Sequence, residues 1–101
     1  MTTLEKVQRL EHYLTVSGSS EDRIITVTID KLIERERNKL HDVIAKLNKE
    51  KNSFETKYQL QSEDFYWRFE GGQMGDDIDF MEWASVIEML RNANTGLKLL
   101  Q

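Results

Sequence analysis

The residues best suited to bind a ligand lie between two expected helices, where glycines and acidic side chains gather over residues 71–82. Gly71, Gly72 and Gly75 precede a helix start, which is how a phosphate-binding loop is built. Such a loop also needs a Lys or a Ser/Thr after its glycines, whereas the residues that follow here are acidic. Carboxylates beside the glycines would repel a phosphate group, so the sequence argues against a phosphate loop.

The acidic side chains of this segment fit either a weak magnesium site or a set of helix caps. An EF-hand loop needs oxygen ligands at regular spacing and a Glu at its twelfth position. Glu88 is the twelfth residue counted from Asp77, but Met81 occupies the fifth position, where a ligand is required. We favour the interpretation in which the glycines stop one helix and Asp76 or Asp77 caps the next. A magnesium site remains the alternative, and we expect no cofactor.

Side chains that could catalyse a reaction are scattered along the sequence. The chain has no cysteine, and His12 and His41 lie far in sequence from any group that would activate a nucleophile. The serines of residues 17–20 belong to a glycine-containing link and to a helix cap. We therefore expect a protein that is not an enzyme and that functions by binding.

The longest element expected is a helix over residues 22–58, which contains no glycine or proline. Its apolar side chains recur at helical spacing, so they form a stripe along one side. Residues 30–58 alone would measure roughly 40 Å, so other helices or a second copy must cover the stripe. We expect a homodimer interface formed by Ile29, Ile33, Leu40, Val43, Leu47 and Phe54.

The start of this helix is ambiguous, because residues 24–29 are rich in β-branched side chains. Ile25, Val27 and Ile29 alternate as they would in a strand. A strand followed by a helix resembles the DNA-reading ribbon of ribbon–helix–helix antitoxins. Ile25, Ile29 and Leu32 are equally spaced for one helix face, and no helix breaker follows. We favour a helix, and the strand remains the alternative.

Shorter helices flank the long one. Thr2 or Thr3 can cap the first, Ser20 or Asp22 the second, and Ser62 the third. Gly18 is expected to end the first helix and Gly96 the last. The expected helices span residues 3–16, 22–58, 62–70 and 77–94. We expect a single all-α domain over residues 1–101, with an N-terminal part (1–16), a long helix (22–58) and an acidic aromatic module (62–94), assembled as a dimeric helical bundle.

The composition suits long amphipathic helices, since 32% of the 101 residues are charged and none is proline. The lack of cysteine, of a signal-peptide core and of a bilayer-length apolar run predicts a cytoplasmic protein without membrane contact. Charge is uneven: residues 23–57 carry nine Lys/Arg and six Asp/Glu, whereas residues 62–90 carry eight Asp/Glu and one Arg. An acidic module repels nucleic acid and attracts basic protein surfaces.

The acidic module also concentrates aromatic side chains. Phe65 and Phe69 share one helix face and can join the core, whereas Tyr66 and Trp67 cannot both follow them. Aromatic side chains ringed by charge are typical of protein interfaces. We predict a surface for a basic partner protein, formed by Tyr66, Trp67, Met74, Asp76, Asp77 and Asp79. The alternative is that Trp67 packs beneath the long helix of the dimer.

The C-terminal part of the sequence resembles a group of small prokaryotic proteins. The segments that carry the resemblance are residues 29–34, 54–58, 62–66, 68–70, 71–77 and 79–83. In that group a long helix leads to an F-x-x-K-Y turn and then to a segment similar to GELGDDxDFFEW. The group commonly has Gly after the K-Y, where this chain has Gln59. The resemblance implies the antitoxin half of a toxin–antitoxin pair, and it implies no established enzyme activity.

Two kinds of function follow from these patterns. The first is a protein–protein interaction module, an antitoxin-like neutraliser of a basic, toxin-like partner. The alternative is a self-associating homodimeric regulatory protein that contacts DNA through residues 23–28. The sequence favours the first, because the acidic module is suited to protein rather than nucleic acid.

Overall fold

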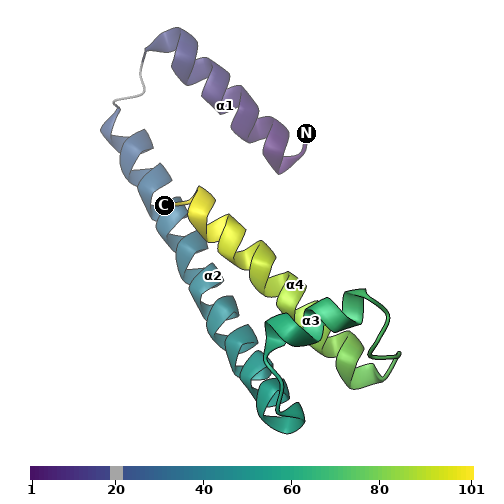
Figure 1. Cartoon of the computed structure of the whole chain (residues 1–101). Helices are drawn as coiled ribbons and strands as arrows, with labels where there is room; N and C mark the ends of the chain where they lie inside the picture. The colour runs from purple at the N-terminus through teal and green to yellow at the C-terminus, as the bar shows by residue number, and fades with distance from the viewer. Residues whose placement is uncertain (19–21) are drawn as a thin grey trace. The chain divides into compact units, whose positions relative to one another are not determined.

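The computed structural model describes residues 1–18 and 22–101, and all of its regular secondary structure is α-helical. The helices are α1 (Thr3–Ser17), α2 (Arg23–Tyr58), α3 (Ser62–Glu70) and α4 (Ile78–Leu99), shown in Figure 1. No strand occurs in this part of the chain, so the prediction of an all-α protein with a long central helix is confirmed. Residues 24–29 lie within α2, so the alternative strand does not form.

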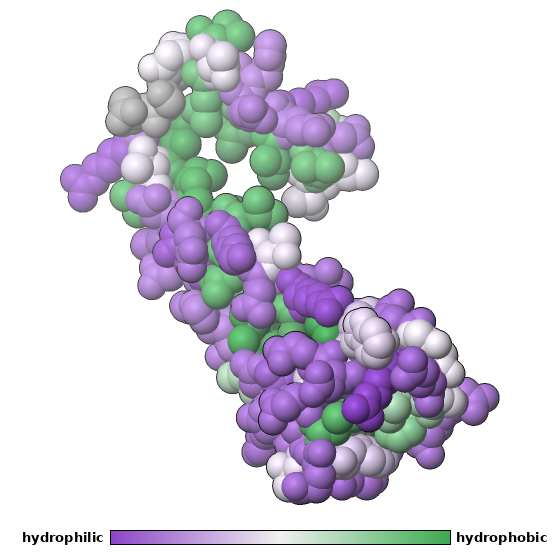
Figure 2. All heavy atoms as spheres, in the orientation of Figure 1, coloured by the Kyte–Doolittle hydropathy of each residue, from purple (hydrophilic) through white to green (hydrophobic). Residues whose placement is uncertain are grey.

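The chain divides into two compact units, Met1–Arg35 and Glu36–Gln101, with the boundary inside α2. Every buried residue that the structure describes belongs to the second unit. In the first unit, α1 has no buried residue. Figure 2 accordingly shows apolar side chains uncovered over the first unit, whereas hydrophilic side chains cover most of the visible face of the second.

Local capping chemistry sets the helix ends in the N-terminal unit. Thr2 and Glu5 form a capping box at the start of α1, in which each side chain accepts the other residue's backbone N–H. Gly18 ends α1 with a φ of 69°, a left-handed conformation that glycine adopts without strain. The Asp22 carboxylate accepts two backbone N–H groups of the first turn of α2. Ser20, the other expected cap, lies outside the described residues.

The core of the second unit is an aromatic cluster around Trp83 of α4. Trp83 and Phe65 of α3 are fully buried, and their rings stack with centroids 3.9 Å apart and planes 4° from parallel. From α2, the rings of Phe54 and Tyr58 also stack on Trp83, with centroids 5.7 and 5.9 Å away. One indole ring of α4 therefore contacts both α2 and α3.

A second cluster extends the core along α2 and α4. Leu47, Val86 and Leu90 are buried together, with Ile44 and Phe54 at the edge. Figure 1 shows α4 running back beside α2. Full burial of such a side chain contributes about 1.5–3 kcal/mol, so this contact is a large part of the stability. The helix α4 of the same chain covers much of the apolar stripe of α2.

The cap of α3 differs from the expectation, because Gln61 rather than Ser62 is its N-cap. The Ser62 hydroxyl is buried and accepts the indole N–H of Trp83 at 3.0 Å. A buried indole N–H without an acceptor would be costly, so Ser62 serves the core instead of the helix end.

The end of α4 also differs from the expectation, because the helix passes through Gly96 and continues to Leu99. A Cβ atom at residue 96 would lie only 3.4 Å from a methyl carbon of Leu40 on α2. Gly96 thus packs against Leu40 inside the helix, and α4 continues through it despite the weak helix propensity of glycine, which costs about 1 kcal/mol.

Gln59, between α2 and α3, is the one residue other than glycine in the described chain with a positive φ, 52°. This left-handed conformation costs a residue with a side chain about 1–2 kcal/mol. The Gln59 amide donates to the carbonyl oxygen of Thr56 at 2.8 Å, which offsets part of that cost.

Replacing Ser62 with Ala tests the role of its hydroxyl in the core. We expect the free energy of unfolding to fall by about 1–3 kcal/mol, because the buried Trp83 N–H loses its acceptor. Urea denaturation followed by circular dichroism measures the change. The exposed Ser85 is the matched control, and Ser85→Ala should remain within about 0.5 kcal/mol of the wild type.

Replacing Gln59 with Gly should raise the stability by about 1 kcal/mol, because glycine adopts a positive φ without strain. The same denaturation experiment measures the gain. Gln59→Ala is the control, since Ala keeps the strain and removes the hydrogen bond to Thr56. An equal gain for both variants would show that backbone strain is not the cause.

Candidate protein-interaction surface

An open groove of about 860 Å³ runs between α2 and α4 within the second unit. Phe54 of α2 and Val86 of α4 line its interior. Three further apolar residues line it from α4 and remain open to solvent: Ile78, Met81 and Met89 are 72%, 54% and 47% exposed. No residue of α3 lines the groove. A groove that combines apolar side chains with a few polar groups is a candidate binding site.

The groove exists because α4 is apolar on two sides. Trp83, Ile87 and Leu90 recur at helical spacing on the buried side. Ile78, Met81 and Met89 lie about half a turn around the helix from them, on the side that borders the groove. Burial within the chain therefore uses only one of the two apolar faces.

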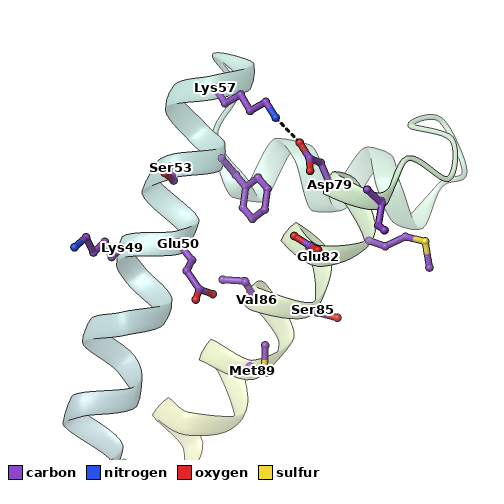
Figure 3. Close-up of a pocket in the computed structure, with 12 residues that line it drawn as sticks. Lys49, Glu50, Ser53, Lys57, Asp79, Glu82, Ser85, Val86 and Met89 are labelled. Atoms are coloured by element: carbon purple, nitrogen blue, oxygen red, sulfur yellow. Dashed lines mark hydrogen bonds and ion pairs between the residues drawn. The ribbon is translucent and has the colours of Figure 1, made fainter.

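Two carboxylates lie inside the groove. Figure 3 shows the side chains of Glu50 from α2 and Glu82 from α4 in the space between the helices, with Lys49 directed away from it. Among the described residues neither glutamate forms a hydrogen bond or an ion pair. The groove thus combines an apolar lining with two acidic groups that have no basic partner.

One end of the groove is closed by a polar cluster around Asp79. Lys57 of α2 forms an ion pair with its carboxylate at 2.6 Å, and the Tyr58 hydroxyl donates to the same oxygen. These two hydrogen bonds hold the pKa of Asp79 below its ordinary value of 3.8. The hydrogen bond to Asp79 also raises the pKa of Lys57 and of Tyr58. The cluster joins the end of α2 to the start of α4.

The predicted partner-binding aromatics lie in different environments. Trp67 is 72% exposed. Tyr66 is half-buried against α4, where its hydroxyl donates to Glu88 at 2.9 Å and Arg91 lies over its ring at 4.4 Å. The neighbouring carboxylates of Glu70 and Glu88 raise the pKa of Tyr66 to about 12. Tyr66 is thus already engaged within the chain.

The other predicted partner-binding residues are likewise either engaged within the chain or exposed to solvent. Met74 is half-buried against the aromatic core, and Asp79 belongs to the cluster with Lys57 and Tyr58. Asp76 and Asp77 are exposed, and Asp77 caps α4 by accepting the backbone N–H of Asp79. Trp67, Asp76 and Asp77 are therefore the predicted residues that a partner could reach without rearrangement.

Half of the residues predicted to form the dimer interface pack against α4 of the same chain instead. Leu47 is buried with Val86 and Leu90, Phe54 stacks on Trp83, and Leu40 packs on Gly96. Ile29 and Ile33 are half-buried, and Val43 is exposed. The homodimer remains a prediction, and its accessible part is Val43 together with the apolar surface of residues 1–35.

Comparisons with known proteins identified no relative of this chain. The chain has no significant match to a protein-family model, to a curated protein or to a solved structure. Within residues 1–18 and 22–101, no helix is long and apolar enough to span a membrane. In the same part of the chain, no three His, Asp or Glu side chains are grouped so that they could hold a metal ion. The capping role of Asp77 agrees with the favoured interpretation of the acidic segment.

The groove was not predicted from the sequence. The spacing of Ile78 and Met81, three apart, and Met89, eight further on, does indicate a second apolar stripe on α4. That signal is partial, because Glu50 and Phe54 come from α2 and the sequence does not reveal which side of α2 faces α4. The groove appears only when the two helices are packed.

Replacing Asp79 with Asn should change how stability depends on pH. Because the pKa of Asp79 is lowered by folding, its carboxylate contributes stability above pH 3.8 that is lost as the pH falls below that value. We expect Asp79→Asn to be less stable at neutral pH and to lose less stability on acidification. Thermal denaturation between neutral pH and about pH 2 measures this. Asp76→Asn, which removes an exposed carboxylate, should retain the wild-type dependence.

Proposed function

We propose that this chain is a protein-interaction module rather than an enzyme, and that it binds and neutralises a basic partner protein as an antitoxin does. The observation that carries this proposal is the open groove between α2 and α4. It offers Ile78, Met81 and Met89 to a ligand while the fold itself depends on the opposite side of α4. Burying these side chains under a partner would supply hydrophobic free energy that the isolated chain does not use.

The charge of the module supports a basic partner. Residues 62–90 carry eight acidic residues and one Arg. A surface with such an excess of one sign speeds the encounter with an oppositely charged protein and disfavours nucleic acid. Trp67 supplies a second contact in this proposal, because an exposed tryptophan is a frequent source of binding energy.

The antitoxin-like role is suggested by the resemblance over residues 29–90. In the segment from Gly71 to Trp83 the acids cap α4 and fix its start, and Ile78 at that start borders the groove. In this proposal the recognisable segment thus helps to position the binding surface rather than to carry out chemistry.

Self-association is the second candidate, and one observation favours it. The unit of residues 1–35 exposes Leu4, Val7, Leu10, Ile24 and Val27. A second copy of the chain would cover such side chains in a homodimer with a regulatory role. In this alternative, DNA contact through residues 23–28 would be made by a helix, since those residues lie in α2.

Co-expression with the protein encoded beside this chain tests the proposal. We expect the pair to purify together, and Met81→Asp to abolish the pairing, because a charge would enter the apolar groove. Trp67→Ala should weaken it by about tenfold or more, a typical loss for an interfacial tryptophan. Both side chains are exposed, so the circular dichroism spectrum of each variant should match the wild type.

Leu99→Asp is the matched control, because Leu99 is exposed but lies outside the groove. It should pair as the wild type does. If Met81→Asp pairs normally, the groove is not the binding site. If the chain forms a dimer when purified alone, and its exposed apolar residues are needed for that dimer, the second candidate is favoured.

A further inference from the structure

We infer that the groove between α2 and α4 recognises one kind of ligand, an amphipathic helix with basic side chains on both flanks of its apolar stripe. This inference rests on the proposed function and specifies the part of the partner that would be bound. It follows from the shape of the groove, from its two carboxylates and from the positions of the nearby lysines.

The backbone of the ligand must satisfy its own hydrogen bonds. The groove is formed by the side chains of two helices, whose backbone groups are already paired within each helix. An extended peptide lying there would leave N–H and C=O groups without partners at an apolar surface. A helix pairs its backbone internally and presents a convex row of side chains, so it fits a groove between two helices.

The direction of α4 gives the groove a length that matches a short helix. Lys57 meets Asp79 at one end, and Leu40 meets Gly96 beyond the other end, so α2 and α4 are antiparallel. Ile78 and Met89 are eleven residues apart along α4, which is roughly 16 Å of helix. Three turns of a bound helix would cover that length, with apolar residues at every third or fourth position.

The charges inside the groove determine which side chains the bound helix should carry on its two flanks. Glu50 lies on the α2 wall of the groove and Glu82 on the α4 wall, and both side chains lie in the space between the helices. Neither is neutralised within the described chain, because Lys57 is held by Asp79 and Lys49 is directed away. A bound helix would enclose both carboxylates at an apolar interface, where an unpaired charge is costly. Lys or Arg on each flank would remove that cost.

The same charges argue against a second copy facing the groove. In a symmetric pair, each groove would face its equivalent and bring the Glu50 and Glu82 carboxylates of both copies into one apolar gap. Four carboxylates without counter-charges would repel one another. Two concave surfaces would also leave the gap unfilled, whereas a helix fills it.

Peptide binding to the full-length chain tests this inference. The first probe is a synthetic amphipathic helix with leucines along one stripe and lysines on both flanks. The second is the same peptide with glutamate in place of each lysine. Isothermal titration calorimetry at low and high salt measures both dissociation constants. We expect the lysine peptide to bind more tightly, and salt to reduce the difference.

Variants of the chain distinguish binding at the groove carboxylates from attraction by the net charge of the protein. Glu50→Gln with Glu82→Gln should weaken binding of the lysine peptide by about tenfold, the loss expected when two ion pairs are removed. Glu34→Gln with Asp42→Asn changes the net charge by the same amount on α2, outside the groove, and should have little effect. Met81→Asp reports separately on the apolar part of the site.

Each outcome supports or overturns a defined claim. A loss confined to the Glu50 and Glu82 variant supports the inference. Equal losses in the two charge variants, or equal binding of both peptides, overturn it, and the proposed function survives if Met81→Asp still abolishes binding. Failure of both peptides to bind, or a dimer of the chain alone that Met81→Asp dissociates, overturns the groove as a site for a partner helix.

Discussion

The fold of residues 36–101 depends on the burial of one indole ring. Trp83 stacks on Phe65 of α3 and on Phe54 and Tyr58 of α2, and its N–H is accepted by Ser62. Stacked aromatic pairs add about 0.5–1.5 kcal/mol each beyond the burial of their area. Because these contacts join α4 to both α2 and α3, loss of the ring would remove packing among all three helices at once. The short helix α3, which has little stability alone, is fixed by this contact.

The orientation of Trp83 also determines what α4 presents to solvent. Once the side of α4 that carries Trp83 is buried, the opposite side with Ile78, Met81 and Met89 must face outward. Leu47 of α2 is buried against Val86 and Leu90 of α4, and the Lys57–Asp79 ion pair and the Leu40–Gly96 contact lie toward the two ends of the packed segments. The groove therefore follows from the core, although none of the three exposed apolar residues contributes to that core.

Local features of the structure could be predicted from the sequence, and features that depend on tertiary packing could not. The absence of helix breakers over residues 22–58, the stop at Gly71 and Gly72, and the cap at Asp77 are signals within a few residues of the feature they set. Ser62 and Gly96 carry the same kinds of local signal, but packing overrode them: one serves Trp83 and the other admits Leu40. The apolar stripe of α2 was recognised, but the helix that covers much of it was not, because periodicity shows that a face is buried and not by what.

The composition of the groove differs from what stability alone would require. Exposed positions on α4 could carry Lys, Gln or Glu without loss of helix propensity, yet the chain has Ile78, Met81 and Met89 there. Methionine side chains are flexible and adapt to irregular surfaces, which suits the proposed binding of a separate helix. Glu50 and Glu82 add a charge requirement that an apolar groove lacks, because a helix without basic flanks would leave both carboxylates unpaired. In the proposed complex the apolar residues would supply affinity, and the two carboxylates would restrict which helix can bind.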